Sequence, residues 1–407
     1  MYKVYQKIIL ACLLLVMTGT VYSQRVTQTI NDGWKFSLFE GDASTADFDI
    51  SGWTDVSIPH TWNAKDADDE IPGYFRGKGW YRKLVTVEEL IPEQRVYLSF
   101  EGANQETNVF VNGTFVGNHK GGYSAFTFDV TDYVHAGRNL IAVSVDNSHN
   151  PDIAPLSADF TFFGGIYRDV YLVYTSPVQL STTHYASSGV YLKASKITDL
   201  QADISVKTFL SNALKSNQSL ILETEILDAD GNRVALSQKK VNVKAEEKNV
   251  AFEALMTITQ PKRWDVDSPY IYKVYSRLKN KKEEVLDCVV NPLGIREYRF
   301  DAEKGFFLNG KYRKLIGTSR HQDYKGMGNA LRDEMHIRDV QLSKDMGSNF
   351  LRVAHYPQDP VVMQMCDKLG LLTSVEIPVV NAITQSKAFM DNCVEQVTEM
   401  VCQNYNY

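Results

Sequence analysis

The chain has 407 residues, of which 44% are hydrophobic and 23% are charged. This composition is typical of a globular protein with two or three domains. The formal net charge is -6, which argues against nucleic acid or an anionic membrane as the main partner, because both attract a basic surface.

The N-terminus has the pattern of a targeting segment. Lys3 and Lys7 precede an apolar run at residues 8–17 that is too short to span a bilayer comfortably, and small residues follow up to Ser23. We therefore predict a cleaved signal peptide at residues 1–23 and a secreted or periplasmic protein that has no membrane attachment after cleavage.

Residues 24–176 are predicted to form a β domain. Short alternating runs, such as residues 95–100 and 107–117, are separated by Gly, Asn and Asp. Asn112 and Gly113 lie between two such runs and predict a two-residue hairpin, because both residue types tolerate positive φ. Many short strands of this kind indicate a jelly-roll β-sandwich.

Residues 177–292 form a second predicted β region. Alternating runs recur at residues 201–210, 220–235 and 270–280, and Asp230-Gly231 predicts a tight turn inside the second of them. A region of this length and pattern is typical of an immunoglobulin-like β-sandwich.

Residues 293–407 change to a β-α-β-α-β-α pattern, which predicts a parallel sheet. Asp359-Pro360 is expected to start the second helix as N-cap and first helical residue, and Gly370 to end it. The pattern matches the first three βα units of a TIM barrel. A complete barrel takes about 250 residues, and fewer than half of that number follow Leu293, so we expect a partial barrel.

Polar residues follow each of the three predicted barrel strands. His321 ends the first strand, Arg352 and His355 end the second, and Glu376 ends the third. The carboxyl ends of the strands form the active-site face of a TIM barrel. These four residues are therefore candidates for a functional site.

Six motifs occur in one order along the chain: IPHTWN (58–63), GYFRGKGWYRK (73–83), HKGGYSAFTFDVT (119–131), FFGGIYRDVYL (162–172), GTSRHQDY (317–324) and FLRVAHYPQDP (350–360). With these motifs the chain resembles glycoside hydrolase family 2, and most closely its β-galactosidase branch. The resemblance implies a jelly-roll sugar-binding domain, an immunoglobulin-like sandwich and a catalytic TIM barrel.

The resemblance also implies a retaining exo-glycosidase. Such an enzyme needs two carboxylates about 5–5.5 Å apart, and in the family both are glutamates at the ends of the fourth and seventh barrel strands. We expect both beyond Tyr407, so no catalytic residue is assigned within this chain.

Three residues are implied to bind the sugar. His321 and His355 match histidines that bond sugar hydroxyls in the family, and Asp159 matches an aspartate that reaches from the jelly roll into the barrel mouth. The competing interpretation is that each side chain only caps a strand or a turn. Arg168 and Asp169 are interpreted as a structural pair on a strand near the barrel.

The remaining candidates are assigned supporting roles. Arg352 is expected either to pair with a catalytic carboxylate or to form a structural ion pair, and Glu376 to orient groups in the pocket. Val380 and Ala382 stand where better-known β-galactosidases carry magnesium ligands, so we predict no magnesium site of that type and no other metal or cofactor. Asn381 is a further candidate for a sugar-hydroxyl contact.

The predicted function is a secreted retaining exo-β-glycosidase acting on terminal β-D-galactosides of oligo- or polysaccharides. One competing hypothesis is a catalytically inactive carbohydrate-binding fragment. Another is a family member that acts on a β-glucuronide or a β-mannoside. Carbohydrate is the expected partner, and a homo-oligomer of the full-length enzyme is left open.

Overall fold

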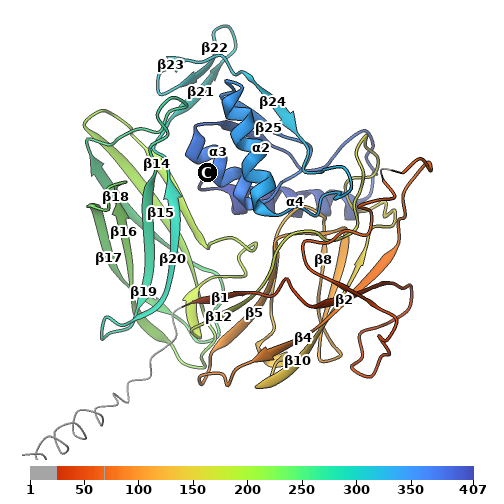
Figure 1. Ribbon diagram of the computed structural model, residues 1–407. Coiled ribbons are helices and arrows are strands. Elements are labelled where there is room, and N and C mark those ends of the chain that lie inside the picture. The colour runs from red at the N-terminus through yellow and green to blue at the C-terminus, as the bar shows by residue number, and fades with distance from the viewer. Residues whose placement is uncertain (1–24, 68) are drawn as a thin grey trace, which may run out of the picture.

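The computed structural model describes residues 25–67 and 69–407 (Figure 1). The predicted signal peptide lies outside the described residues. In Figure 1 a red-to-yellow sandwich lies beside a green sandwich, and the blue C-terminal units lie above and between them. Within the described part of the chain, no helix is long and apolar enough to cross a membrane.

The first domain is a jelly-roll sandwich of antiparallel strands. One sheet has the order β1-β12-β5-β9, a second has the order β3-β2-β4-β10-β7-β8, and β11 pairs with β6. The strands are β1 (Val26–Thr29), β2 (Trp34–Leu38), β3 (Thr54–Val56), β4 (Lys78–Val87), β5 (Arg95–Phe100), β6 (Ala103–Asn104), β7 (Glu106–Val111), β8 (Thr114–Lys120), β9 (Phe126–Asp129), β10 (Gly137–Asp146), β11 (Gly165–Ile166) and β12 (Val170–Thr175). Their inward-facing side chains form one continuous apolar core.

The hairpin predicted at Asn112-Gly113 is confirmed. Val111 pairs with Thr114, so the loop has two residues. Asn112 and Gly113 have φ values of 52° and 81°, which a type I′ turn requires at both central positions.

The second domain is a sandwich of two sheets. One has the order β13-β15-β14, with β18 also paired to β15, and the other has the order β17-β16-β19-β20. The strands are β13 (Val178–Leu180), β14 (Val190–Ser195), β15 (Gln201–Asn212), β16 (Gln218–Leu227), β17 (Arg233–Val243), β18 (Val250–Thr259), β19 (Tyr272–Lys279) and β20 (Val285–Leu293). The turn at Asp230-Gly231 is longer than predicted, because Leu227 pairs with Arg233 after a register shift.

The C-terminal region contains the predicted βαβαβα unit. A small antiparallel sheet precedes it, and a parallel sheet of order β24-β25-β26 forms its centre. The elements are β21 (Tyr298–Asp301), β22 (Gly305–Leu308), β23 (Lys311–Tyr312), β24 (Gly317–Arg320), α2 (Asp333–Asp345), β25 (Phe350–Val353), α3 (Pro360–Leu369), β26 (Leu372–Val375) and α4 (Lys387–Asn404).

Helix α3 has the predicted ends. The Asp359 side chain accepts a hydrogen bond of 2.9 Å from the Val361 N–H, and Pro360 occupies the first helical position. Gly370 is left-handed, with φ 75°, and its N–H donates to the Cys366 carbonyl. Both ends therefore satisfy backbone groups that a helix leaves unpaired.

Helix α4 packs with its polar face toward the jelly roll. Gln396 and Glu399 are buried there, whereas Met390, Val394 and Val401 on the apolar stripe are exposed. A surface helix usually buries its apolar face and exposes its polar face. Helix α4 does the reverse.

Candidate functional site

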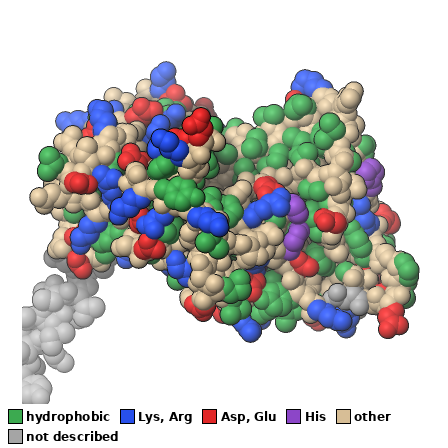
Figure 2. All heavy atoms as spheres, turned by 90° about the horizontal axis from the view of Figure 1, so that it is seen from above, with side chains coloured by type: hydrophobic (Ala, Val, Ile, Leu, Met, Phe, Trp, Pro, Cys, Tyr) green, Lys and Arg blue, Asp and Glu red, His purple; other side chains and the backbone are tan. Residues whose placement is uncertain are grey.

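The parallel sheet brings the predicted strand-end residues to one edge. Gly317 of β24 pairs with Phe350 of β25, which in turn pairs with Leu372 of β26. The three strands therefore end side by side. His321 follows β24, His355 follows β25 and Glu376 follows β26. Figure 2 shows histidine, cationic and acidic side chains next to one another on one face of the molecule.

Arg352, His355 and Glu376 form one polar cluster. The Arg352 Nε and Nη2 atoms donate to the two Glu376 carboxylate oxygens at 2.5 and 2.9 Å. His355 Nδ1 lies 3.4 Å from Glu376 Oε2 and 3.2 Å from Arg352 Nη2. This bidentate geometry is the strong form of the arginine–carboxylate pair.

The ion pair defines the chemical state of Glu376. Hydrogen bonding to Arg352 lowers the pKa of Glu376 below its ordinary value, which keeps the carboxylate ionised at neutral pH. A general acid needs the opposite shift. Glu376 is therefore suited to orienting Arg352 and His355, and its supporting role in sugar binding stays a prediction.

His321 lies next to His355 at the neighbouring strand end. The two imidazole rings have centroids 5.2 Å apart, and His321 Nδ1 is 3.1 Å from the Tyr356 hydroxyl. Burial lowers the pKa of His321, although the charges of Asp323 and Asp159 act in the opposite direction. A neutral imidazole carries one donor and one acceptor, which matches a sugar hydroxyl.

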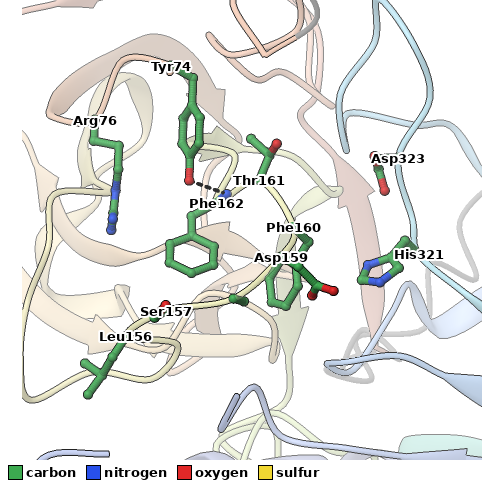
Figure 3. Close-up of a pocket in the computed structure, with 11 residues that line it drawn as sticks. Tyr74, Arg76, Leu156, Ser157, Asp159, Phe160, Thr161, Phe162, His321 and Asp323 are labelled. Carbon is green, nitrogen blue, oxygen red and sulfur yellow. Dashed lines mark hydrogen bonds between the residues drawn. The ribbon is translucent and has the colours of Figure 1, made fainter. Parts of the chain in front are cut away.

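A loop of the jelly roll reaches these histidines. Phe160 stacks against His355 with centroids 5.8 Å apart and contacts His321 at 5.4 Å. Asp159 precedes it and lines a cavity of about 560 Å³ between the jelly roll and the end of β24. Figure 3 shows the Asp159 carboxylate and the His321 ring near one another. The cavity is lined by Tyr74, Arg76, Leu156, Ser157, Ala158, Asp159, Phe160, Thr161, Phe162, His321 and Asp323.

Asn381 lies beside this site and outside the cavity lining. Its backbone pairs with Ser157 of the jelly-roll loop, its φ is 58°, and its side chain is exposed. The structure brings the other five candidates to the carboxyl edge of the sheet or to the cavity. Asn381 as a sugar contact stays a prediction.

Sequence reasoning missed the aromatic part of the site. Tyr356 is buried, stacks on Tyr123 of the jelly roll with centroids 4.2 Å apart and supports His321. Phe160 directly follows the predicted Asp159, and this adjacency was the only sequence feature that could have indicated its place in the site. Neither aromatic residue belongs to a strand whose periodicity predicts its partner.

The predicted Arg168–Asp169 pair is wrong as a direct contact. Arg168 donates to carbonyl and amide oxygens around the site, whereas Asp169 accepts from Asn31 Nδ2 at 2.9 Å and from the Tyr171 hydroxyl at 3.0 Å. Arg168 lies at a bend between β11 and β12, and its side chain reaches the barrel loops, whereas the partners of Asp169 belong to the jelly roll.

Carboxylates gather behind the site, where the jelly roll meets α2 and α3. Burial, and then repulsion from Asp359 and Asp169, raise the pKa of Asp333 to about 6. Burial, followed by repulsion from the same two carboxylates, raises the pKa of Glu101 to about 8. Within residues 25–67 and 69–407, no three His, Cys, Asp or Glu side chains are grouped so as to hold a metal ion.

The fold and the site define a multidomain protein of the TIM-barrel class, in which a sandwich domain contributes a loop to the carboxyl edge of the barrel sheet. Family models match the chain along almost its whole length. They describe the glycosyl hydrolases family 2 sugar binding domain at residues 27–177, glycosyl hydrolases family 2 at 188–296 and the family 2 TIM barrel domain at 301–405. The chain belongs to glycoside hydrolase family 2.

Relatives in the family carry two names. A β-glucuronidase of Bacteroides fragilis is 36% identical over 97% of this chain and 56% of its own length. A β-galactosidase of Thermoanaerobacter pseudethanolicus is 34% identical over 94% of this chain and 49% of its own length. The chain thus spans about half the length of the curated relatives it matches.

Solved structures of Bacteroides uniformis β-glucuronidase 2 are also similar. One, covalently bound to cyclophellitol-6-carboxylate aziridine, is 41% identical with a TM-score of 0.90 and covers 94% of this chain and 46% of that one. Another is described as a calcium binding mutant in which two aspartates are replaced by alanine. It is 39% identical over the same shares, with a TM-score of 0.87.

Proposed function

We propose that this chain forms the sugar-recognition half of a retaining exo-β-glycosidase. The observation that carries the proposal is the convergence of His321, His355, Asp159 and the Arg352–Glu376 pair at the carboxyl edge of the parallel sheet. Imidazoles and carboxylates bond sugar hydroxyls, and Phe160 beside them offers an apolar surface.

We rank a terminal β-D-glucuronide first as the substrate and the predicted β-D-galactoside second. The glucuronide is supported by the names of several relatives and by the carboxylate of the inhibitor bound to the B. uniformis enzyme. Against it, Arg352 is already paired with Glu376 and is not free to bind a uronate. β-Galactosidase relatives support the galactoside.

We propose that the chain by itself binds sugar without hydrolysing it. Retaining hydrolysis needs a second carboxylate about 5–5.5 Å from the first, and the ion pair with Arg352 commits Glu376 to another role. Secretion or periplasmic location is proposed from the N-terminal pattern alone.

The test measures binding and turnover separately. D-Glucuronate and methyl β-D-galactoside are titrated into the 407-residue chain by NMR, and p-nitrophenyl β-glycosides of both sugars are assayed for hydrolysis. We expect binding of at least one sugar, a tenfold or greater loss in His321→Gln and His355→Gln, and no loss in the control His135→Gln, which is exposed on the jelly roll. Binding of neither sugar contradicts the site, and turnover that disappears in Glu376→Gln contradicts the non-hydrolytic role.

We also propose that a calcium ion binds between α2, α3 and the jelly roll. Asp333 and Asp359 have the same separation along the chain as the two aspartates replaced in the calcium binding mutant of the B. uniformis enzyme. Besides burial, repulsion from Asp359 and Asp169 contributes to the raised pKa of Asp333, while the charges of Arg168 and Arg320 act on Asp359 in the opposite direction. Calcium takes six to eight oxygen ligands, including backbone carbonyls and waters, so two carboxylates suffice to anchor it.

Thermal unfolding in the presence of metal tests this site. After chelation, CaCl2 at about a hundred times its dissociation constant should stabilise the chain by about 2.7 kcal/mol, and MgCl2 by much less. Asp333→Asn with Asp359→Asn should abolish the shift, and asparagine retains an acceptor for the start of α3. Asp345→Asn is the matched control, because Asp345 is an exposed carboxylate at the other end of α2. An unchanged calcium shift in the double variant contradicts the assignment.

A further inference from the structure

Arg168 connects the jelly roll to both histidine loops of the barrel. It lies between β11 and β12 and is only 3% exposed. Its Nη1 atom donates to the carbonyls of Glu101 and Tyr123 at 3.2 and 3.0 Å, both within the jelly roll. Its Nη2 atom donates across the domain boundary to Gln322 Oε1 at 2.9 Å and to the Pro357 carbonyl at 2.7 Å.

The two barrel acceptors adjoin the two candidate sugar ligands. Gln322 directly follows His321 and is 1% exposed, and Pro357 follows His355 by two residues. One nitrogen atom therefore holds the loops after β24 and β25 at the same time. These loops come from different βα units, and their imidazoles lie 5.2 Å apart.

Arginine suits this task better than other residues. Its planar guanidinium offers donors in fixed directions, so that one side bonds the jelly roll and the other bonds the barrel. Stacked aromatic side chains support it: Arg168 lies over the Tyr167 ring at 5.0 Å, and Tyr123 stacks on Tyr356. Lysine has a single nitrogen and cannot span the same four acceptors.

We propose that Arg168 is a positioning residue of the sugar site, which sets the spacing of His321 and His355 by clamping their loops to the jelly roll. The role in sugar binding rests on the proposed function, whereas the clamping of the histidines does not. A displacement of about 1 Å in a preorganised site can cost about a hundredfold in rate, so we expect loss of the clamp to be measurable at the sugar site.

The first experiment compares two buried arginines. Arg168→Met and Arg168→Lys remove the clamp, and Arg82→Met is the control, because Arg82 is also 3% exposed and donates to backbone carbonyls at Ala43 and Thr45 within the jelly roll. We expect both Arg168 variants to move the NMR signals of the His321 and His355 rings and to weaken sugar binding tenfold or more. Arg82→Met should leave the ring signals and the affinity within twofold, even where it lowers the melting temperature as much.

A second variant keeps the test decisive where an Arg168 variant does not fold. Gln322→Met removes one barrel acceptor and leaves the jelly roll intact, so it should shift the His321 ring signals more than those of His355. Unchanged ring signals in both Gln322→Met and a folded Arg168 variant overturn the proposal, and so does an equal effect of Arg82→Met. If the wild-type chain binds neither D-glucuronate nor methyl β-D-galactoside, the proposed function fails, while the ring signals still decide whether Arg168 positions the histidines.

Discussion

The two sandwiches and the barrel units differ in how completely they bury their apolar surface. Each sandwich closes a continuous core between two sheets. The parallel sheet has a smaller core between β25, α2 and α3 and leaves β24 and β26 as edges. Contacts with the jelly roll hold the barrel units in place, through the docking of α4 and through the hydrogen bonds of Arg168. The site therefore depends on an interface as much as on its own sheet.

Truncating one core leucine in each region should cause the largest losses in the free energy of unfolding, and the two losses should differ. Leu98 in β5 and Leu351 in β25 are both fully buried. We expect Leu98→Ala to cost about 4 kcal/mol, because a closed sandwich relaxes little around the cavity, and Leu351→Ala to cost about 2 kcal/mol, because the open sheet relaxes more. Denaturant unfolding of both variants measures the difference, and equal losses would refute the contrast.

The stability of the jelly roll should depend on pH through His60. Burial lowers the pKa of His60 to about 4 from the ordinary 6.5, so between these values the unfolded chain binds more protons than the folded one. Stability should fall as the pH drops from 6.5 to 4, by at most about 3 kcal/mol. His60→Gln should flatten this dependence and the exposed His135→Gln should not, as urea midpoints measured across the range would show. If His60→Gln kept the full dependence of stability on pH, the titration of His60 would be excluded as its cause.

The fold was largely predictable from the sequence, because its signals are local. Asn112-Gly113 and Asp359-Pro360 each carry the chemistry of their turn or cap within two residues. The length of the loop at Asp230-Gly231 could not be predicted, because it depends on a register shift between β16 and β17.

The site was predictable only where strand ends reveal it. His321, His355, Arg352 and Glu376 follow from the parallel sheet, but Phe160, Tyr356 and Arg168 act across a domain boundary that no periodicity describes. The apolar stripe of α4 was visible in the sequence, whereas the docking of its polar face on the jelly roll was not. That docking depends on long-range pairs such as His119–Glu399.

Removing the His119–Glu399 contact, which holds α4 on the jelly roll, should lower the free energy of unfolding by an intermediate amount. Glu399 is buried and lies 2.9 Å from His119 Nε2 on the jelly roll. Glu399→Leu leaves that imidazole without its partner, at a cost of about 2 kcal/mol. Hydrogen exchange should then speed up in α4 before it does in β5, whereas Glu395→Leu, one turn earlier and exposed, should change little. Uniform acceleration across both regions would mean that α4 is not a separate docking unit.

Charging the exposed face of α4 should have the smallest effect on stability and a visible effect on association. Val394 is 54% exposed and lies on a stripe with Met390, Val397 and Val401, whereas Leu255 on β18 of the second sandwich is 68% exposed. Val394→Lys and Leu255→Lys should each change the free energy of unfolding by less than about 0.5 kcal/mol, because neither side chain is buried. An apolar stripe promotes self-association more than a single exposed side chain does, so sedimentation should show less association in Val394→Lys and no change in Leu255→Lys. Equal behaviour of the two variants would mean that the incomplete burial of the barrel units does not govern how the chain associates.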